Sequence, residues 1–589
     1  MNKKIIIAKQ KKLIIFFTIV VAIVLSLIRA FFGADLTDEA LYIAEPFIVI
    51  QGATPYVSDW FQSAGFALIS SPVIRLFLSF NSSTSGIVLF TRIAFVVFKF
   101  MVCLIAFLLI KKHFTSEISI LFLLPIFLIS PHSIANFSYN TLSLFFLFLE
   151  NILIFSSFME KNSIKKIFYS LFSGILSALC AFIYPSQIIQ CVIMLIIILY
   201  ISIVFRRKSF FVLSYIAGGL MTATVLIAYL SVQAGGTDGL MYCLNSMINK
   251  SAYAELVNYN VFALLRDHLF KTLTDLKIFF IFLIFTILLI CYSNQKKTSG
   301  NNRIFNSENI VLYLFVFSTF CLIITFIFYC RDKIFNSYIY LIVSFFIIPF
   351  LLFFVKLEKQ KFQLIFIIIW ISSACSTLIA GFSYGGIINR YYFLIAGSSL
   401  IILFAQPFLF KNIQLNALPK YYFPRIFCLI LSLFSVFGYY GYIYREDILP
   451  KLNHKIEYGA YSGIYTTSEK ALAIIEVEKN IRNLTTAEDT VLFMDWVPFG
   501  YFMTDAKACA PSTTDMMAYT YGMNSPQIMY DYFQFINKIP DKIIYVNFGR
   551  DKQLSIEDTD YLFNSFVNNN YTFFQKIHGK YYLFAYEIK

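Results

Sequence analysis

The chain has 589 residues, of which 59% are hydrophobic and only 14% are charged. A soluble domain carries about 25% charged residues, so this composition excludes a soluble protein and places most of the chain in lipid. The net charge of +14 does not indicate nucleic-acid binding, because the basic residues fall in short runs between apolar segments, where they orient membrane helices.

The first apolar segment, residues 13–32, follows five lysines. It is longer than the core of a signal peptide and shows no small-residue cleavage site, so we interpret it as an uncleaved transmembrane helix. Twelve further apolar segments predict spans. They cover residues 86–110, 117–135, 139–158, 167–183, 186–205, 209–232, 276–293, 309–328, 337–355, 362–380, 391–410 and 425–444.

The basic residues test this count of about 13 helices. With the N-terminus inside, 22 Lys and Arg fall on the inner side and 7 in the outer loops. Because cytoplasmic loops are enriched in basic residues, this asymmetry predicts a multi-pass protein of the plasma (inner) membrane with a cytoplasmic N-terminus. The odd number of spans then places the C-terminus outside.

The outer regions divide the chain into two predicted domains. Residues 1–444 form the membrane domain, with a first outer loop at 33–85 and a middle outer loop at 233–275. Residues 445–589 are less apolar and predict an extracytoplasmic mixed α/β domain. It is expected to contain a helix at 468–484 with Ser468 as N-cap, strands at 490–495 and 542–548, and a hairpin of 571–576 with 581–587.

The first outer loop is the most informative part of the sequence. It holds five acidic residues and no basic residue between Gly33 and Trp60. On a helix beginning near Asp38, Glu45 returns to the same face two turns later. Gly52 and Pro55 turn the chain, which predicts that Asp59 comes back toward that face.

These acids have two interpretations. In the simpler one, Thr37 or Asp38 is a helix N-cap and the other acids are solvated, with Asp35 facing the lipid headgroups. In the other, the acids are functional, since unpaired carboxylates against the membrane are repelled by lipid phosphates. A carboxylate held there can act as a general base toward an acceptor hydroxyl or amine.

An acidic pair after the first helix, then Tyr42, then Gly52-Ala53-Thr54-Pro55-Tyr56 and Asp59, resembles the first outer loop of the GT-C glycosyltransferases. This superfamily includes the protein O-mannosyltransferases and the lipid A aminoarabinose transferases. The resemblance covers about residues 13–200 and implies a GT-C-like all-α polytopic bundle. It also implies that Asp38 is the catalytic base, with Glu39 as its companion.

The same resemblance implies substrate-binding roles for Tyr42 and Asp59. Residues 62–80, which are apolar but interrupted by Pro72 and Arg75, match the juxtamembrane helix of the family. Arg92 stands early in the next span, where these proteins often carry an arginine. The sequence departs from the family at Trp60-Phe61-Gln62, where many relatives have Lys-Pro-Pro.

By the same resemblance the donor is a polyprenyl-phosphate sugar, which needs cations on the outer side. The candidates are Arg390, Arg331 and Lys333, although outer basic residues at the ends of spans are more often interface anchors. A divalent cation held by Asp38 and Asp59 stays open, because the superfamily contains metal-using and metal-free members. No other cofactor is expected, and no Walker, zinc or GxGxxG pattern is present.

The sequence therefore predicts a membrane glycosyltransferase that moves a sugar from a polyprenyl-phosphate donor to a cell-envelope glycan, lipid or protein. The first rival is a transporter or flippase for lipid-linked sugars, which predicts ionisable residues within the membrane. Lys99 and Glu150 are the candidates for that role. The second rival is a non-catalytic envelope scaffold, which gives the first-loop acids no special role.

Overall fold

A computed structural model describes residues 2–128, 134–205, 210–250, 364, 366–373, 375–376, 443–494, 496–513, 525–547, 561–578 and 581–589. The predicted spans at 276–293, 309–328, 337–355 and 391–410 lie outside the described residues, as do residues 425–442 of the last span and a smaller part of 362–380. Within the described part, each predicted span corresponds to a helix. These are α1 (Asn2–Arg29), α4 (Ile87–Ile110), α5 (Ser116–Leu128), α6 (Tyr139–Met159), α7 (Ser163–Ile183), α8 (Ile188–Val204) and α9 (Phe210–Gln233).

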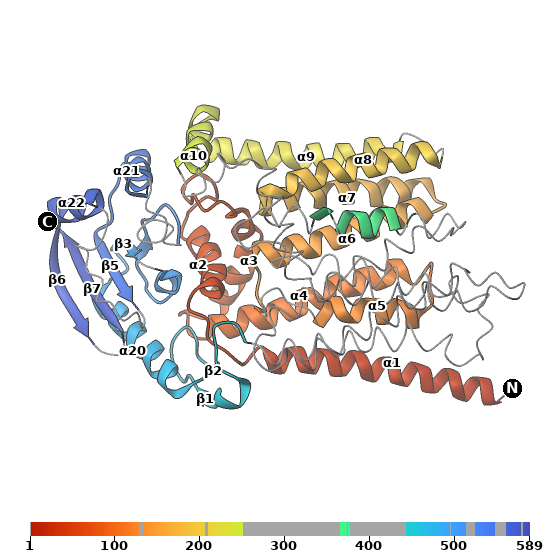
Figure 1. The fold of residues 1–589 in the computed structure, drawn as a ribbon, viewed down its shortest axis with the longest axis horizontal. Coiled ribbons are helices and arrows are strands. Elements are labelled where there is room, and N and C mark those ends of the chain that lie inside the picture. Colours follow the sequence, from red (N-terminus) through yellow and green to blue (C-terminus); the bar gives the residue numbers. More distant parts are fainter. Residues whose placement is uncertain are drawn as a thin grey trace, which may run out of the picture.

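Five segments of the described chain are long and apolar enough to cross a membrane. They are α4, α6, α7, α9 and the unit Pro185–Val204, in which the 3-10 turn η2 (Pro185–Gln187) leads into α8. The helices run side by side along the long axis of the molecule (Figure 1). The chain is therefore a multi-pass membrane protein, while the total of 13 helices stays a prediction.

Two glycines allow a close contact between α7 and α9. A Cβ on Gly174 of α7 would lie 2.0 Å from the backbone oxygen of Tyr215, and one on Gly218 of α9 would lie 2.1 Å from that of Leu171. Lipid supplies no hydrophobic force between helices, so membrane helices associate through close packing of small residues. These two glycines let α7 and α9 approach at backbone distance.

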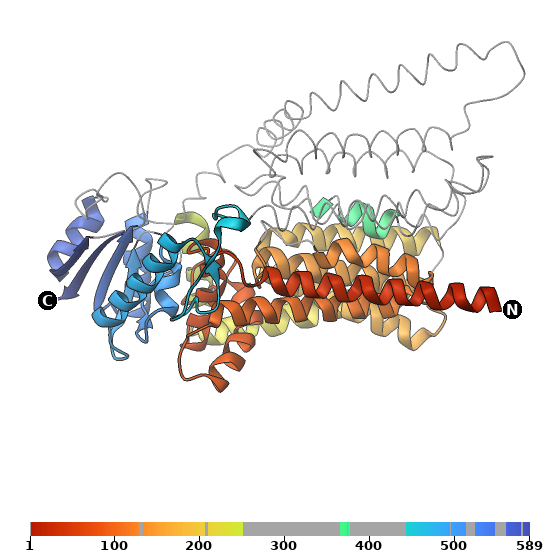
Figure 2. The same cartoon turned by 90° about the horizontal axis from the view of Figure 1, so that it is seen from below.

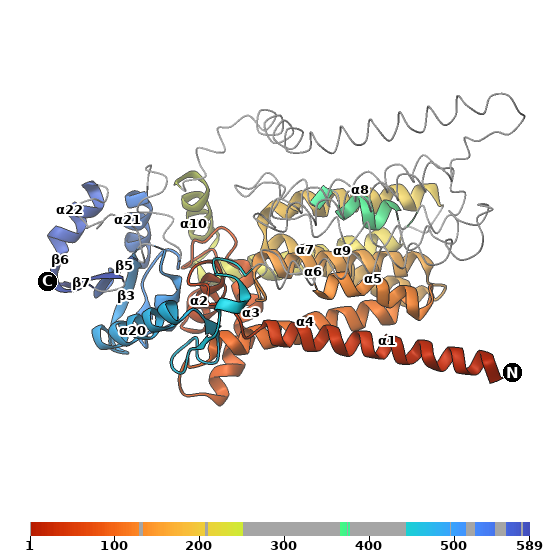
Figure 3. The ribbon, with the colours of Figure 1, turned by 60° about the horizontal axis from the view of Figure 1, so that its bottom comes forward.

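The N-terminus and the tail lie at opposite ends of the bundle (Figures 1 and 2). Three short helices lie between the tail and the long bundle helices (Figure 3). They are α2 (Asp38–Ile50), α3 (Gly65–Phe80) and α10 (Thr237–Lys250). The helices predicted near Asp38 and at 62–80 are thus present as α2 and α3, and α3 begins three residues later than predicted.

The tail is a mixed α/β domain, as predicted. Its five-stranded sheet has the order β4-β3-β5-β7-β6, with β3 parallel to β4 and β5 and with β7 antiparallel to β5 and β6. The strands and helices are β1 (His454–Lys455), β2 (Tyr465–Thr466), α20 (Ser468–Leu484), β3 (Thr490–Met494), β4 (Lys507–Ala508), α21 (Ser525–Ile536), β5 (Lys542–Asn547), α22 (Tyr561–Asn570), β6 (Tyr571–His578) and β7 (Tyr582–Ile588).

Of two detailed predictions about the tail, one is confirmed and one is corrected. The hairpin of β6 and β7 is confirmed, with Tyr571 paired to Ile588 and His578 paired to Tyr582. Ser468 is the first residue of α20 and not its N-cap, because Thr467 occupies that position in extended conformation without a side-chain hydrogen bond to the helix.

The tail is built onto the first outer loop. The backbones of Phe31 and Gly33 exchange hydrogen bonds of 2.7 and 2.8 Å with Tyr465, forming a parallel bridge between loop and tail. The Gln51 side chain adds bonds of 3.2 Å to the backbones of Ala506 and Ala508. The buried apolar residues of the loop and tail belong to one continuous core. Loop residues are therefore held in place by the tail.

Candidate functional site

Helix α2 begins with an unexpected cap. The Asp35 carboxylate accepts hydrogen bonds from the backbone N–H of Glu39 at 2.8 Å and of Thr37 at 3.1 Å, and from the Thr37 hydroxyl at 2.6 Å. Thr37 occupies the N-cap position without capping through its side chain. Thr37 is thus the N-cap residue, as one of the two expectations had it, while the side-chain bonds to the first N–H groups come from Asp35. The expectation that Asp35 faces the headgroups is wrong, because Asp35 folds back and is buried.

Burial also changes the acidity of Asp35. Loss of hydration, reinforced by the nearby Asp38 carboxylate, raises the pKa of Asp35 to about 6, against the bonds from Thr37 and Glu39, which act in the opposite direction. Burial disfavours the charged form of a carboxyl group, which is the dominant cause here. Asp35 is thus a structural acid at the start of α2.

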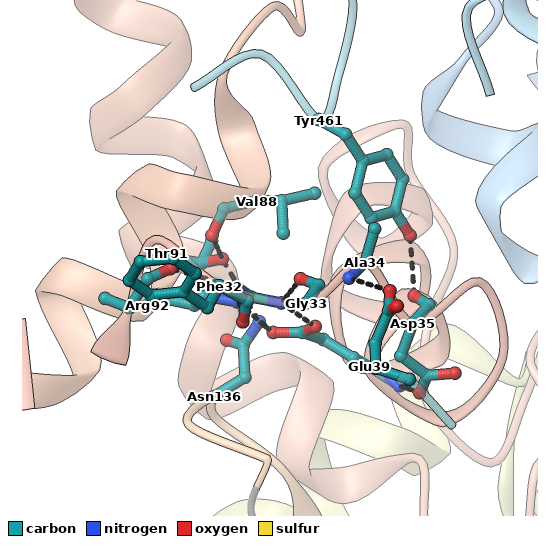
Figure 4. A network of polar contacts seen from close by, with 12 residues as sticks. Phe32, Gly33, Ala34, Asp35, Glu39, Val88, Thr91, Arg92, Asn136 and Tyr461 are labelled. Carbon is teal, nitrogen blue, oxygen red and sulfur yellow. Dashed lines mark hydrogen bonds and ion pairs between the residues drawn. The ribbon is translucent and has the colours of Figure 1, made fainter. Parts of the chain in front are cut away.

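Glu39 is held by a buried ion pair with Arg92 of α4. The guanidinium Nε donates to Glu39 Oε1 at 2.7 Å and Nη2 donates to Oε2 at 2.5 Å, so the pair is bidentate. Both side chains are almost fully buried. Asn136 Nδ2 approaches the same Oε1 at 3.4 Å, as Figure 4 shows.

Arg92 also fixes the end of the first helix. Its remaining donors bond the backbone oxygens of Ala30 at 2.9 Å, Phe32 at 3.1 Å and Gly33 at 2.6 Å (Figure 4). A planar guanidinium with several donors is suited to such a junction. The Glu39–Arg92 pair therefore locks the α1 end, α4 and the start of α2 into one geometry, and it positions the neighbouring Asp38.

Asp38 is the more accessible member of the acidic pair. Its side chain is 24% exposed. The Tyr444 hydroxyl donates a short hydrogen bond to Asp38 Oδ2, and Arg445 Nη2 lies 3.7 Å from the same oxygen. Arg445 also stacks over the Tyr444 ring at 5.0 Å and donates to the Thr37 hydroxyl. The predicted base thus lies between a phenol and a half-exposed guanidinium.

Sequence reasoning missed Tyr444 and Arg445. They lie 406 and 407 residues after Asp38, and no local pattern connects the two regions. The available signal was an aromatic residue at the end of the last predicted span and a basic residue directly after it. Arg445 has a φ of +53°, a backbone conformation that is uncommon outside glycine. Such strained residues gather at functional sites.

Tyr42 lies away from the surface. It is buried, and its ring packs edge-on against Phe66 and Tyr139, with centroids 5.9 Å away in both cases. Tyr139 in turn stacks on Tyr184 at 5.3 Å. This aromatic cluster joins α2 and α3 to α6. This position gives Tyr42 a packing role, and its role in substrate binding stays a prediction.

Asp59 returns toward α2 as predicted, and it meets Glu45. Both side chains are fully buried. Asp59 Oδ1 accepts from the Phe61 N–H at 3.0 Å, and Glu45 Oε1 accepts from the Thr513 N–H at 3.2 Å and from its hydroxyl at 2.5 Å. Asp59 Oδ2 and Glu45 Oε2 have no donor of their own in the described part of the chain.

The acidity of Asp59 is changed by this environment. Burial, followed by the adjacent Glu45 carboxyl, raises the pKa of Asp59 well above its usual value. A second carboxyl group nearby disfavours the charged form. The raised pKa therefore favours a protonated Asp59 at the junction of loop and tail.

The predicted cations Arg390 and Arg331 lie outside the described residues. Among the residues that are described, no group of three or more His, Cys, Asp or Glu forms a ligand set for a metal ion. Asp59 lies beside Glu45, whereas Asp38 faces Tyr444 and Arg445. A divalent cation held by Asp38 and Asp59 stays a prediction.

The two intramembrane ionisable residues have partners of different kinds. Glu150 of α6 accepts from the Tyr215 hydroxyl at 2.9 Å, and that hydroxyl lies 2.8 Å from Ser177 Oγ. The Lys99 ammonium of α4 lies 5.3 Å from the ring centroids of Phe95 and Phe127. Both are buried. Glu150 thus bonds α6 to α7 and α9.

The described fold and site define a multi-pass membrane protein with an acidic centre at the junction of its bundle and an α/β tail. No protein-family model and no curated protein matches the chain. Solved structures of the oligosaccharyltransferase of Archaeoglobus fulgidus are similar to it. One carries a tethered acceptor peptide with the NVT sequon, one is the apo form, and one is AglB in complex with an inhibitory peptide and a dolichol-phosphate.

The likeness extends over most of the chain at low identity. For the three structures in that order, the identity is 11, 11 and 12% and the TM-score 0.44, 0.43 and 0.43. They cover 91, 90 and 91% of this chain, which spans 69% of theirs. At this TM-score the overlay assigns no role to any residue.

Proposed function

We propose that this protein is a membrane glycosyltransferase that moves a sugar from a polyprenyl-phosphate donor to a cell-envelope acceptor. The observation that supports it best is the setting of Asp38. A partly exposed carboxylate stands at the start of α2, beside a guanidinium and a phenol, on a helix that the buried Glu39–Arg92 pair holds in place. A positioned carboxylate of this kind suits general-base catalysis.

In the proposed reaction Asp38 accepts the proton of an acceptor hydroxyl or amine as that group attacks C1 of the sugar. The new bond to C1 forms while the bond from C1 to the phosphate oxygen breaks, and the lipid phosphate leaves with the electron pair. A single displacement inverts the configuration at C1. Glu39 serves as the positioning partner through its ion pair with Arg92.

The departing lipid phosphate carries negative charge that a cation must stabilise. Arg445 is the described cation nearest the base, at 3.7 Å from Asp38, and its side chain is 47% exposed. Arginine binds phosphate bidentately, which suits this role. We further propose that Arg390 and Arg331 contact the lipid phosphate. Asp59 and Tyr42 are proposed to bind the acceptor.

The proposed reaction takes place on the outer side of the plasma membrane, where the basic asymmetry of the sequence puts the first loop and the tail. The proposed mechanism routes no step through a metal ion. The donor brings its own bond energy as a lipid-linked sugar.

The test is an assay of purified protein with a panel of polyprenyl-phosphate sugars and an envelope extract as acceptor. We expect release of free polyprenyl phosphate that depends on which sugar the donor carries. The Asp38→Asn variant should not release it. Liposomes containing the protein and a labelled lipid-linked sugar separate the rivals. Movement of the lipid across the bilayer without release of polyprenyl phosphate supports the flippase. The absence of both movement and release supports the scaffold.

A further inference from the structure

The two adjacent acids at the start of α2 each face an arginine, and the two pairs are built differently. Glu39 and Arg92 form a bidentate pair whose side chains are only 3% and 5% exposed (Figure 4). The side chains of Asp38 and Arg445 are 24% and 47% exposed, and their nearest atoms, Oδ2 and Nη2, are 3.7 Å apart. That separation is longer than a hydrogen bond, and an exposed ion pair contributes little to stability. Arg445 can therefore change its partner, whereas Arg92 is fixed.

The tail fixes the backbone of Arg445 and leaves its side chain half exposed. The backbone oxygen of Arg445 accepts a hydrogen bond from Lys470 Nζ at 3.2 Å. The next residue, Glu446, accepts from the same Nζ at 2.8 Å and from the N–H of Ala34 at 2.6 Å. These bonds hold Arg445 in its left-handed conformation, with a φ of +53°. A new partner is therefore reached by rotation of the side chain, without movement of the tail.

We propose that Arg445 alternates between two anions: it contacts Asp38, as the structure shows, and it moves to the phosphate of the lipid-linked donor when the donor binds. The inference rests on the proposed function, which requires a lipid phosphate as ligand, and it adds a regulation of the same site. A phosphate offers two oxygens to the planar guanidinium, and bidentate pairs of this kind are stronger than the single approach to Asp38.

Departure of Arg445 changes the setting of Asp38. A cation beside a carboxylate favours its charged form and so opposes transfer of a proton to it. Without Arg445, the Asp38 carboxylate still accepts the hydrogen bond from the Tyr444 hydroxyl, which keeps it oriented. The Thr37 hydroxyl, which Arg445 also contacts, still donates to Asp35 at 2.6 Å, so the start of α2 stays in place. Donor binding thus makes Asp38 the stronger proton acceptor.

The test measures binding and needs no transfer activity. A radiolabelled short-chain polyprenyl phosphate is titrated against the full-length protein in phosphatidylcholine nanodiscs. Asp38→Asn removes the charge that holds Arg445, so this variant should bind the lipid phosphate more tightly. The gain from releasing Arg445 should reach at most about fivefold, which is what an exposed ion pair can supply. Arg445→Gln should weaken binding.

A double variant separates this effect from simple charge repulsion. Asp38→Asn also relieves repulsion between the carboxylate and the phosphate, and that relief remains when Arg445 is absent. The gain in affinity from Asp38→Asn should therefore be larger in the wild-type background than in the Arg445→Gln background. Such a difference is the coupling that a double-mutant cycle measures. Equal gains in the two backgrounds would overturn the proposed exchange.

Two controls test whether the effect is specific. Asp505→Asn is the matched variant, because Asp505 lies 3.4 Å from another partly exposed arginine, Arg482. It should leave the dissociation constant unchanged, and a gain equal to that of Asp38→Asn would mean a general effect of charge. Phosphatidylglycerol replaces the polyprenyl phosphate in the second control. The same coupling with this phospholipid would overturn the proposal, because Arg445 would then be a contact for ordinary headgroups.

The exchange and the glycosyltransferase fail in different ways. If the coupling is measured but no donor yields transfer, the exchange at Arg445 stands and the proposed activity does not. If transfer is measured while the gains in the two backgrounds are equal, the activity stands and the exchange is wrong. A thermal melt of each variant shows that the compared proteins are folded.

Discussion

The two ends of helix α2 hold acids in opposite electrostatic settings. At the N-terminal end, Asp38 and Glu39 face the guanidinium groups of Arg445 and Arg92. In the C-terminal half, Glu45 faces Asp59 and a threonine, with no cation among the contacts described for either acid. Cations favour carboxylates, whereas a second buried acid favours a neutral carboxyl group.

This difference suits the N-terminal end of α2 to a catalytic role and its C-terminal half to a structural one. A partly exposed carboxylate can take a proton from an acceptor, so the N-terminal end of α2 is suited to the proposed reaction. A buried pair of carboxyl groups is suited to joining two segments, here the loop and the tail residue Thr513. The five acids of this loop therefore do not share one electrostatic setting.

The largest expected effect tests the N-terminal end directly. Asp38→Asn keeps nearly the same volume and removes the ability to accept a proton. Transfer should fall by roughly 10²–10⁴-fold, the range that general-base catalysis supplies. Donor turnover by the purified variant measures this. Asp505→Asn, at a tail acid that is 72% exposed, is the control. Full transfer by folded Asp38→Asn would remove Asp38 from the mechanism.

The second effect concerns Glu39. Glu39→Gln leaves the Arg92 guanidinium buried without its carboxylate, and removal of one partner of a buried pair costs about 3–5 kcal/mol. We expect a large fall in the melting temperature in detergent. Glu478→Gln is a matched comparison, because its partner Arg482 is 33% exposed and the loss should be smaller. Equal losses would mean that burial of Arg92 adds nothing.

The third effect concerns the phenol beside the base. Tyr444→Phe removes the hydroxyl that donates to Asp38 and keeps the ring under Arg445. A hydrogen bond to a charged group is worth about 1.5–3 kcal/mol, so kcat should drop roughly tenfold or more. The KM for donor should change little if Tyr444 positions Asp38. A rise in KM at constant kcat would instead indicate a substrate contact.

Features that depend on interactions between residues near in the sequence could be predicted, whereas those that depend on distant residues could not. The starts and ends of α4, α6 and α20 follow from apolar periodicity and helix propensity, which are local, and the predicted limits agree with the structure within a few residues. The presence of an acidic centre after α1 and an arginine early in α4 also followed from the sequence.

The partners of the acids did not follow from it. Pairing of Asp38 with Tyr444 and Arg445, and of Glu45 with Thr513, depends on how the tail packs against the loop. Asp35 was misassigned for a local reason, since a carboxylate can reach the N–H groups two and four residues on and cap the helix from outside. The contacts of Asp38 and Glu45 with the tail have no spacing along the chain that sequence reasoning could recognise.

The smallest expected effect tests the C-terminal half of α2 through pH. The pKa of Asp59 is raised in the folded state by burial and by Glu45. A raised folded pKa gives stability that is complete below the unfolded pKa of about 3.9 and is lost as pH rises through the folded value. The loss is at most about 1.4 kcal/mol for each pH unit, because one proton is involved.

Asp59→Asn removes this dependence, because the amide is neutral at every pH. Its oxygen can still accept from the Phe61 N–H, and its NH₂ can donate to Glu45 Oε2. The melting temperature of the variant should therefore gain on that of the wild type as pH rises from about 4, with Asp505→Asn following the wild type. Parallel curves for Asp59→Asn and wild type would show that Asp59 is ionised in the folded protein, and the two ends of α2 would then not differ as proposed.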